Sequence, residues 1–311
     1  MSIEGVTRRL AGKFEGTLLR DEPMARHTTY RIGGPAALYA VCTGMGDLEL
    51  LLSALAEERV AWTVVGRGSD LLVADAGYGG CIIVLGGAFE KVEFPATECP
   101  GDDALPVRAG AGVSLTRLAR ECAERGLSGL EFAAGIPGTL GGALFMNAGA
   151  HECAIGSIVV TITCYVRPEG LIELPATSVD WGYRRGLQRD GAVIVGATLK
   201  VDQGDGQAIV SRMRAYLDRR KAAQPLEYPS CGSVFRNPEG DHAARLISAC
   251  GLKGTACGGA RISEKHANFI VNEHDASAED VRTLIELVQE RVKEKYAIEL
   301  QPELRFLGFP Q

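Results

Sequence analysis

The sequence has neither an excess of positive charge nor a long apolar run. Lys and Arg number 33 against 39 Asp and Glu, which gives a formal net charge of -6. This balance disfavours non-specific nucleic-acid binding, although local arginines can still hold an anionic substrate. Nowhere do about eighteen apolar residues follow one another, as a membrane-spanning helix requires. Residues 1–20 also lack the apolar core of a signal peptide. We therefore expect a cytoplasmic protein that binds neither nucleic acid nor membrane.

The cysteines lack the spacing of a disulfide framework or a zinc site. Their number is odd, no C-x-x-C pair occurs, and several lie in apolar runs such as CIIVL, which begins at Cys81. This pattern favours reduced thiols and predicts no metal centre. The nine positions are Cys42, Cys81, Cys99, Cys122, Cys153, Cys164, Cys231, Cys250 and Cys257.

Residues 1–85 have the pattern of a compact α/β unit. An extended segment precedes a helix that carries Leu48, Leu51, Leu52 and Leu55 on one face. Short apolar runs bounded by glycines follow, and they are typical of buried strands. The expected strands are 35–42, 62–65, 71–74 and 81–85.

Residues 86–202 predict an α+β unit built on a largely antiparallel sheet. PEG at 168–170 supplies a hairpin turn, and one helix at 114–124 buries Leu115, Leu118 and Cys122. Strands outnumber helices here, which is typical of α+β organisation. The expected strands are 92–94, 106–110, 157–166, 171–176 and 192–201.

Residues 203–311 predict a second α+β unit, with the boundary near residue 203. A helix of about fifteen residues follows Asp205 and ends before the prolines of the next loop. Another helix begins near Ser277, whose hydroxyl is suited to an N-cap. Strands are expected at 267–272 and at 297–308.

Two glycine-rich loops suggest a bound dinucleotide. They span residues 64–73 and 135–150, where glycine allows backbone N–H groups to approach a ligand closely. Neither loop is a Walker A motif, and neither has the G-x-G-x-x-G pattern in a βαβ setting. Each loop alone is equally well explained as a tight turn. Together they favour a dinucleotide over two unrelated turns.

Seven motifs occur in order along the chain and resemble those of the UDP-N-acetylenolpyruvoylglucosamine reductase (UDP-N-acetylmuramate dehydrogenase, MurB) family. The resemblance covers the chain from about residue 20 to its end, and it is far more specific than one glycine-rich loop. The motifs are HTTYRIGGPA (27–36), GRGSDLLV (66–73), GLSGLEFAAGIPGTLGGALFMNAGA (126–150), GYRRG (182–186), PSCGSVFRNP (229–238), ISEKHANFIVN (262–272) and LQPELRFLG (300–308).

The resemblance implies an α+β fold with a two-subdomain FAD-binding region of the vanillyl-alcohol-oxidase (PCMH) type and a C-terminal α+β substrate domain. Residues 1–85 and 86–202 would form the FAD-binding subdomains, and residues 203–311 would form the substrate domain. It also implies an enzyme with non-covalent FAD and NADPH as co-substrate. That enzyme reduces UDP-N-acetylglucosamine enolpyruvate to UDP-N-acetylmuramate in peptidoglycan synthesis. The segment before GYRRG is short, which implies the branch without a tyrosine loop over the substrate.

The resemblance assigns site residues by motif. Ser233 matches the proton donor, and Arg184 and Glu303 match the other two catalytic positions. Without it, Ser233 would be explained as a turn residue, and Arg184 and Glu303 as solvated surface residues. Tyr183, Lys221 and Asn237 match substrate-binding positions. The expected FAD-binding residues are Arg31, Gly66, Arg67, Gly68, Ser69, Asp70, Leu71, Gly135, Ile136, Pro137, Gly138, Thr139, Asn147, Ala148 and Gly149.

The roles of several further residues do not follow from the motifs alone. Relatives have asparagine where this chain has Asp70, and an acid beside a pyrophosphate is repulsive unless it points away. Cys231 has no neighbouring base and is better explained as a small packing residue. Arg185 is the obvious alternative to Arg184, and His266 is adjacent to the position where relatives place a substrate-side polar group.

Two other functions compete with the reductase. One is an FAD oxidase of the same fold, which is weakened because residues 62–75 contain no His or Cys for covalent flavin attachment. The other is a non-catalytic nucleotide-binding module, which would not need Arg184, Ser233 and Glu303 together. We expect a monomer or a weak oligomer.

Overall fold

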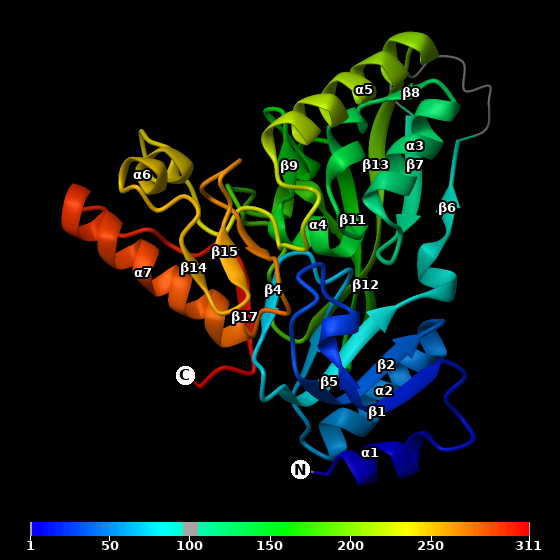
Figure 1. The fold of residues 1–311 in the computed structure, drawn as a ribbon. Helices are drawn as coiled ribbons and strands as arrows, with labels where there is room; N and C mark the ends of the chain where they lie inside the picture. Colours follow the sequence, from blue (N-terminus) through cyan, green and yellow to red (C-terminus); the bar gives the residue numbers. More distant parts are fainter. Residues whose placement is uncertain (1, 96–104, 311) are drawn as a thin grey trace. The chain divides into compact units, whose positions relative to one another are not determined.

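The computed structural model describes residues 2–95 and 105–310 (Figure 1). Cys99 lies outside these residues, and the other eight cysteines are free thiols. The chain divides into two compact units, and each unit is assembled from three segments. Unit 1 contains residues 1–17, 40–66 and 83–220, and unit 2 contains residues 18–39, 67–82 and 221–311. The expected three-part division at 85 and 202 stays a prediction. Within the described residues, no helix is long and apolar enough to cross a membrane.

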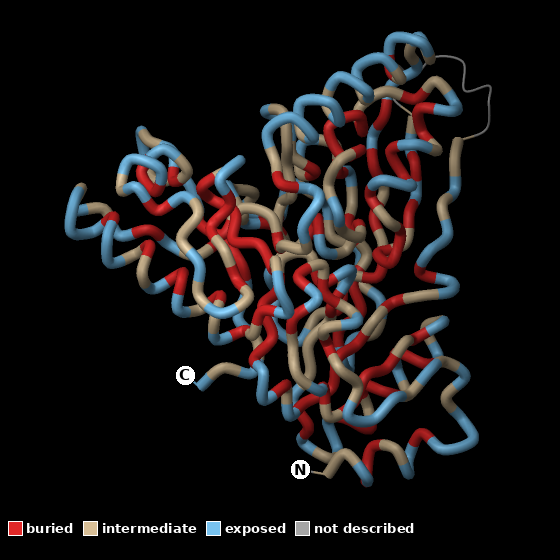
Figure 2. The backbone as a smooth tube through the Cα atoms, viewed as in Figure 1, coloured by how far each residue is buried: buried red, intermediate tan, exposed pale blue. Residues whose placement is uncertain are grey.

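The helices that the apolar periodicity predicts are present. The first leucine-rich pattern forms α2, the pattern at 114–124 forms α3, and the helix after Asp205 runs on to Ala223. In α7 the buried residues recur along one side (Figure 2), as the stripe from Val281 to Val292 predicts. The helices are α1 (Ile3–Leu10), α2 (Met45–Glu57), α3 (Leu115–Glu124), α4 (Leu140–Met146), α5 (Gly206–Ala223), α6 (Ala243–Ala249) and α7 (Ala278–Tyr296).

A six-stranded sheet forms the centre of unit 1, and all its described pairings are antiparallel, as expected. Burial alternates along most of β13, so one face of that strand meets the core. Its core cluster includes Leu118 of α3 and Leu144 of α4. The strands are β6 (Val92–Glu93), β7 (Leu105–Gly110), β8 (Leu127–Ser128), β11 (Val159–Val166), β12 (Gly170–Pro175) and β13 (Ala192–Gln203).

A second sheet has the strand order β1-β2-β5-β3, and its strands β2 and β5 contribute residues to both units. The pair α1 and α2 pack together in unit 1. Neither α1 nor β1 is expected from the sequence. The strands are β1 (Thr17–Pro23), β2 (Pro35–Cys42), β3 (Trp62–Val64) and β5 (Tyr78–Leu85).

Unit 2 is built around α7, a small antiparallel sheet and a parallel pair. Strands β14 (Ala256–Cys257), β15 (Ala260–Ile262) and β16 (Ile270–Asn272) form the sheet. Strands β4 (Leu71–Val73) and β17 (Arg305–Leu307) form the pair, although they are far apart in sequence. The remaining short pieces in the chain are β9 (Gly149–Ala150), β10 (Cys153–Ala154) and 3-10 turns at Met24–Arg26, Gly87–Glu90, Glu131–Gly135, Ile155–Ser157 and Ala176–Ser178.

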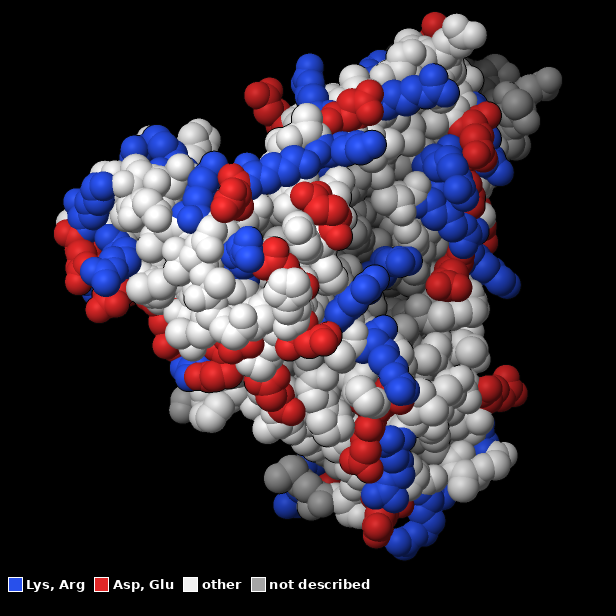
Figure 3. Space-filling model, viewed as in Figure 1, with Lys and Arg blue, Asp and Glu red and all other residues white. Residues whose placement is uncertain are grey.

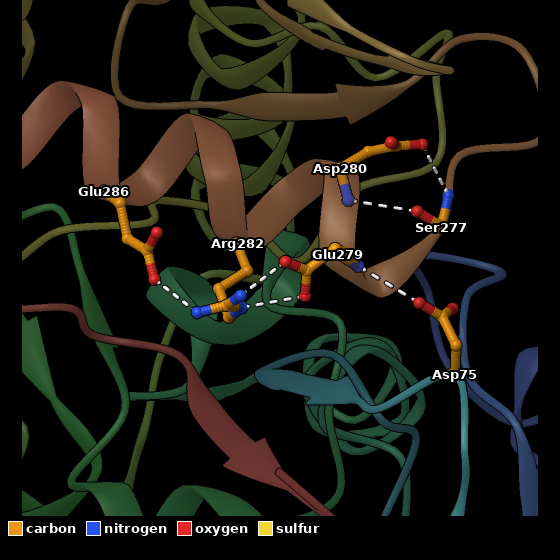
Figure 4. A network of polar contacts seen from close by, with 6 residues as sticks. All are labelled: Asp75, Ser277, Glu279, Asp280, Arg282 and Glu286. Carbon is orange, nitrogen blue, oxygen red and sulfur yellow. Dashed lines mark hydrogen bonds and ion pairs between the residues drawn. The ribbon is translucent and has the colours of Figure 1, made fainter. Parts of the chain in front are cut away.

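The start of α7 is fixed by two sets of side-chain hydrogen bonds (Figure 4). Ser277 and Asp280 form a reciprocal capping box, which confirms the N-cap expected from the sequence. The carboxylate of Asp75 accepts hydrogen bonds from the N–H groups of Ala278 at 2.8 Å and Glu279 at 3.1 Å. A carboxylate at this end also interacts favourably with the helix dipole. These hydrogen bonds from Asp75 connect the segment that carries β4 to the start of α7.

Two strand predictions are wrong in part. Within 267–272 only Ile270–Asn272 is a strand. Within 297–308 only Arg305–Leu307 is a strand, because α7 runs on to Tyr296 and ends at Ala297 in a left-handed conformation with φ of 56°. Pro302 forms only an isolated bridge with Phe235, and proline cannot donate a ladder hydrogen bond. The strand-like composition of the segment therefore does not produce a continuous strand.

Candidate active site

The two glycine-rich loops meet within unit 1. A Cβ built on Gly66 would lie 2.5 Å from Thr139 Oγ1 and 3.2 Å from Thr139 Cγ2, so a larger residue here would displace the threonine side chain. Thr139 is the N-cap residue of α4, and its hydroxyl accepts a weak hydrogen bond from Gly142 N–H at 3.4 Å. The expected cofactor residues at 66 and 139 are therefore neighbours.

The loop from Gly135 to Thr139 is held by its backbone. Gly138 N–H donates to Ile136 O at 3.0 Å, and Gly138 O accepts from Leu115 N–H at 3.0 Å. Leu140 N–H donates to Val113 O at 2.8 Å. Thr139 N–H makes no hydrogen bond with any described residue. A fixed, glycine-lined turn with an available N–H beside a hydroxyl fits the phosphate groups of FAD.

Substitution of Gly66 by alanine should weaken FAD binding by roughly tenfold or more. The new methyl group would displace the Thr139 side chain, and with it the contact between the two loops. A fluorescence titration of the apoprotein with FAD gives the dissociation constant. Gly79→Ala is the matched control, because a Cβ at Gly79 meets nothing within 4 Å. Equal FAD affinity in both variants would contradict the assignment of Gly66.

Arg220 is a residue near this loop that the sequence did not single out. Its Cδ lies 3.0 Å from a Cβ built on Gly135, and burial lowers the pKa of its guanidinium. Among the described residues, none forms an ion pair with it. Basic side chains are visible over α5 in Figure 3, and the RRK run at its end was the available signal. A partly buried cation beside a phosphate-type loop suits an anionic ligand.

The expected residues 147–149 lie beside the turn that carries Arg184. Asn147 adopts the left-handed conformation at the C-terminal end of α4, with φ of 48°. Its Nδ2 donates to Gly182 O at 2.9 Å, and its Oδ1 accepts from Gly156 N–H at 3.0 Å. Asn147, at the end of the second glycine-rich loop, is therefore directly bonded to the GYRRG turn.

The GYRRG turn separates the roles of its two arginines. Gly182 and Arg185 exchange backbone hydrogen bonds of 2.8 and 3.1 Å, and Arg184 lies between them with φ of 55°. The guanidinium of Arg185 forms an exposed ion pair with Asp180 at 2.9 Å. Arg184 is half-buried, and Tyr183 is 59% exposed with its ring centroid 5.5 Å from Arg184 Cζ. The surface pairing of Arg185 leaves Arg184 as the better catalytic candidate.

In unit 2 the turn around Arg31 packs against the second half of the first loop. Thr29 N–H donates to Gly68 O at 3.1 Å, and Thr29 Oγ1 donates to Ser230 O at 2.7 Å. Gly68 has φ of +59°, and a Cβ there would collide with the backbone of His27. Arg31 is exposed and also has a positive φ, of 56°. Arg67 is exposed, and Ser69 and Asp70 are half-buried.

The loop that carries Ser233 is fixed from its C-terminal side. Asn268 is buried and its side chain bonds both backbone groups of Phe235, by Oδ1 to the N–H at 2.9 Å and by Nδ2 to the C=O at 2.8 Å. Asn268 O also accepts from Val234 N–H at 2.8 Å. The hydroxyl of Ser233 makes no hydrogen bond with any described residue. Asn268 is a positioning residue that motif reasoning missed, because its partners lie 33 positions away.

The structure pairs the backbone at Glu303 with the residue that follows Ser233. Glu303 N–H donates to Val234 O at 2.7 Å, and the bridge between Phe235 and Pro302 continues this pairing. Glu303 is 8% exposed, so its carboxyl is largely withdrawn from water. Arg184 belongs to unit 1, whereas Ser233 and Glu303 belong to unit 2.

Cys231 is an unreactive thiol in this surrounding. It is buried, and its pKa is raised above the ordinary range by burial first and then by the charges of Asp70 and Glu303. A thiol rather than a thiolate is a poor nucleophile. Asp70 O accepts from Arg305 N–H at 3.0 Å, at the point where β4 and β17 pair.

The expected substrate residues in unit 2 are exposed. Lys221 lies on the surface, and its carbonyl accepts from Lys265 Nζ at 2.7 Å. Asn237 Oδ1 accepts from Ala243 N–H at 3.1 Å and so caps α6, which leaves its Nδ2 group for a ligand. His266 stacks edge-on with Phe269, and burial lowers its pKa. Among the described residues, no group of three or more His, Cys, Asp or Glu could hold a metal ion.

Two models of known protein families match parts of the chain. Residues 224–307 match the model of the UDP-N-acetylenolpyruvoylglucosamine reductase C-terminal domain, and residues 36–172 match that of an FAD binding domain. These matches confirm the expected order of an FAD-binding region and a C-terminal domain.

Relatives that match nearly the whole chain are UDP-N-acetylenolpyruvoylglucosamine reductases. The UDP-N-acetylenolpyruvoylglucosamine reductase of Bacillus subtilis is 40% identical over 98% of this chain and 99% of its own length. That of Heliobacterium modesticaldum is 45% identical over 95% of this chain and 92% of its own. The crystal structure of UDP-N-acetylenolpyruvylglucosamine reductase from Thermus caldophilus aligns with a TM-score of 0.78 and 31% identity, covering 94% of this chain and 99% of that one. The chain therefore belongs to the UDP-N-acetylenolpyruvoylglucosamine reductase family, as its seven motifs predict.

Proposed function

We propose that the protein is an FAD-dependent reductase that converts UDP-N-acetylglucosamine enolpyruvate to UDP-N-acetylmuramate, with NADPH as co-substrate. This step belongs to cytoplasmic peptidoglycan precursor synthesis and so serves cell-wall biogenesis, cell shape and cell division. The observation that carries the proposal is the backbone pairing that sets Glu303 beside the Ser233 loop, in a chain of this family. When bound and reduced by NADPH, FAD would supply the hydride that adds to the terminal vinyl carbon of the substrate.

Arg184 is assigned to the substrate carboxylate. Hydride addition places negative charge on that carboxylate, and a planar guanidinium can bind both of its oxygens. The half-buried position of Arg184 in a backbone-bonded turn holds the cation before the substrate arrives. Preorganised positive charge stabilises the transition state more than flexible surface charge does.

Ser233 is assigned as the proton donor to the carbon that bears the carboxylate. The added hydride and this proton together saturate the double bond, so the serine forms no covalent bond with substrate. Its hydroxyl is not used by the described chain, and Asn268 fixes the residues that follow it. Glu303 is assigned to act with Ser233, as a hydrogen-bond partner of the developing enol or in proton relay, and its backbone bond to Val234 supports this assignment.

Two sets of residues are assigned to binding. Arg31, Gly66–Leu71, Gly135–Thr139 and the backbone of Asn147–Gly149 are proposed to hold FAD, with Arg220 as an additional cation beside Gly135. Tyr183, Lys221 and Asn237 are proposed to contact substrate, because exposed cationic and amide groups suit its anionic and polar parts.

The purified protein should be yellow and should release FAD on denaturation, since the cofactor is non-covalent. NADPH oxidation, followed by its absorbance under anaerobic conditions, should become continuous only when the enolpyruvyl substrate is added. A colourless protein that does not take up FAD would sink the proposal. Rapid, substrate-independent consumption of oxygen would instead support an oxidase of the same fold.

A further inference from the structure

Both ends of the Asn147 side-chain amide are already bonded within unit 1. Nδ2 donates to Gly182 O at 2.9 Å, and Oδ1 accepts from Gly156 N–H at 3.0 Å. The residue itself ends α4 in the left-handed conformation, with its N–H bonded to Ala143 O. Asn147 is expected to bind the cofactor, but its side chain instead donates one hydrogen bond to the protein and accepts another from it.

The acceptor of this bond is the base of the turn that carries Arg184. Gly182 O also accepts from Arg185 N–H, which closes the turn around Tyr183 and Arg184. Beyond the turn, Gly186 N–H donates to Phe145 O at 3.1 Å, and a Cβ on Gly186 would strike Leu144 O. The turn is thus held on α4 at two points, by Asn147 on one side and by Gly186 on the other.

Packing leaves the Asn147 amide little room to rotate. A Cβ built on Gly156 would lie 2.6 Å from the Trp181 ring and 2.9 Å from Asn147 Oδ1. Trp181 is itself anchored, because its Nε1–H donates to Ala176 O at 2.9 Å. Trp181 directly precedes Gly182 in the chain. Gly156, Trp181 and Asn147 therefore form one packed support beneath the turn.

We propose that Asn147 is a positioning residue for Arg184 and acts in the substrate-reduction step. The hydrogen bond from Nδ2 fixes Gly182, and Gly182 fixes the left-handed backbone from which the Arg184 side chain departs. Tyr183 within the turn is largely exposed, so its side chain adds little packing that would order the segment. Ordering the turn before substrate binds removes a cost that the transition state would otherwise carry. The proposal rests on the function assigned to Arg184 above.

Asn147→Asp is the sharpest variant for a test. It keeps an oxygen that accepts from Gly156 N–H, but it replaces the donor to Gly182 O with a second acceptor. We expect the rate of enolpyruvyl reduction to fall roughly 10–100-fold, as for one lost, partly buried hydrogen bond. The FAD dissociation constant and the rate of FAD reduction by NADPH should stay within about threefold of wild type. Ser157→Ala, which removes a neighbouring exposed bond to Ala154 O, is the control and should change neither.

A double-mutant cycle with Arg184→Met distinguishes positioning from general damage. If Asn147 acts through Arg184, Asn147→Asp should slow the reaction of the Arg184→Met protein by less than about threefold. Additive losses would overturn the proposal, as would a loss of FAD affinity matching the loss of rate, because the side chain would then serve the cofactor. An Asn147→Asp protein as active as wild type would also overturn it.

An inactive wild-type protein would instead overturn the proposed function. Should either variant unfold, the Asn147→Ser protein, analysed with the same cycle and titration, decides the matter.

Discussion

Replacement of Ser233 by alanine should slow reduction of the enolpyruvyl substrate by about 10²–10⁴ or more, the scale of a lost proton donor. Reduction of bound FAD by NADPH should persist, because that half-reaction requires no proton from Ser233. Stopped-flow absorbance of the flavin, first with NADPH and then with substrate, measures the two steps separately. The substitution removes only the Ser233 hydroxyl, which makes no hydrogen bond with any described residue. The loop should therefore keep its hydrogen bonds to Asn268 and Glu303.

Ser230→Ala is the matched control for this experiment. Ser230 lies in the same loop, and its carbonyl, which the substitution leaves in place, accepts the bond from Thr29. Its activity should remain near that of wild type. If Ser233→Ala slowed both half-reactions equally, Ser233 would be a structural residue. If it slowed neither, another group would donate the proton.

The periodicity of apolar residues predicts most of the regular elements. Helix α7 is an example, because the stripe at Val281, Leu284, Ile285, Val288 and Val292 is buried as expected and its Ser277 cap is present. The C-terminal strand was predicted too long for a local reason. Ala297 takes a left-handed conformation, which apolar pattern does not reveal, and Pro302 interrupts any ladder.

The site depends on contacts that local pattern cannot show. Gly66 and Thr139 lie 73 positions apart in the sequence, yet their close approach explains the glycine. Motif resemblance identified both loops, but it did not show that Asn147 bonds the Arg184 turn or that Asn268 clamps the Ser233 loop. In both asparagines the side-chain amide donates one hydrogen bond and accepts another, and these bonds join backbone segments that are distant in sequence. Such residues become visible only through tertiary structure, because an amide that bonds backbone leaves no characteristic spacing.

The two adjacent arginines of the GYRRG turn should differ strongly in their effect on catalysis. Arg184→Met should lower the rate of substrate reduction by about 10²–10³, the scale for loss of a group that stabilises transition-state charge. Arg184→Lys should recover part of this rate, because it restores the charge but not the planar fork. Arg185→Met breaks an exposed ion pair with Asp180 and an exposed hydrogen bond to the Asp180 carbonyl. An exposed ion pair is worth about 0–1 kcal/mol, so the rate of this variant should stay within about fivefold of wild type.

Steady-state kinetics with the enolpyruvyl substrate tests this pair, and FAD content is measured on each variant to exclude loss of cofactor. Both substitutions remove one guanidinium from the same backbone turn, so they share any general effect on that segment. The Arg184 loss should appear in kcat as well as in kcat/KM, because the charge it stabilises develops only as the hydride is added. A larger loss for Arg185→Met would transfer the catalytic role to Arg185. Equal small losses would mean that neither guanidinium touches the carboxylate, and the developing charge would then have to be stabilised by another cation.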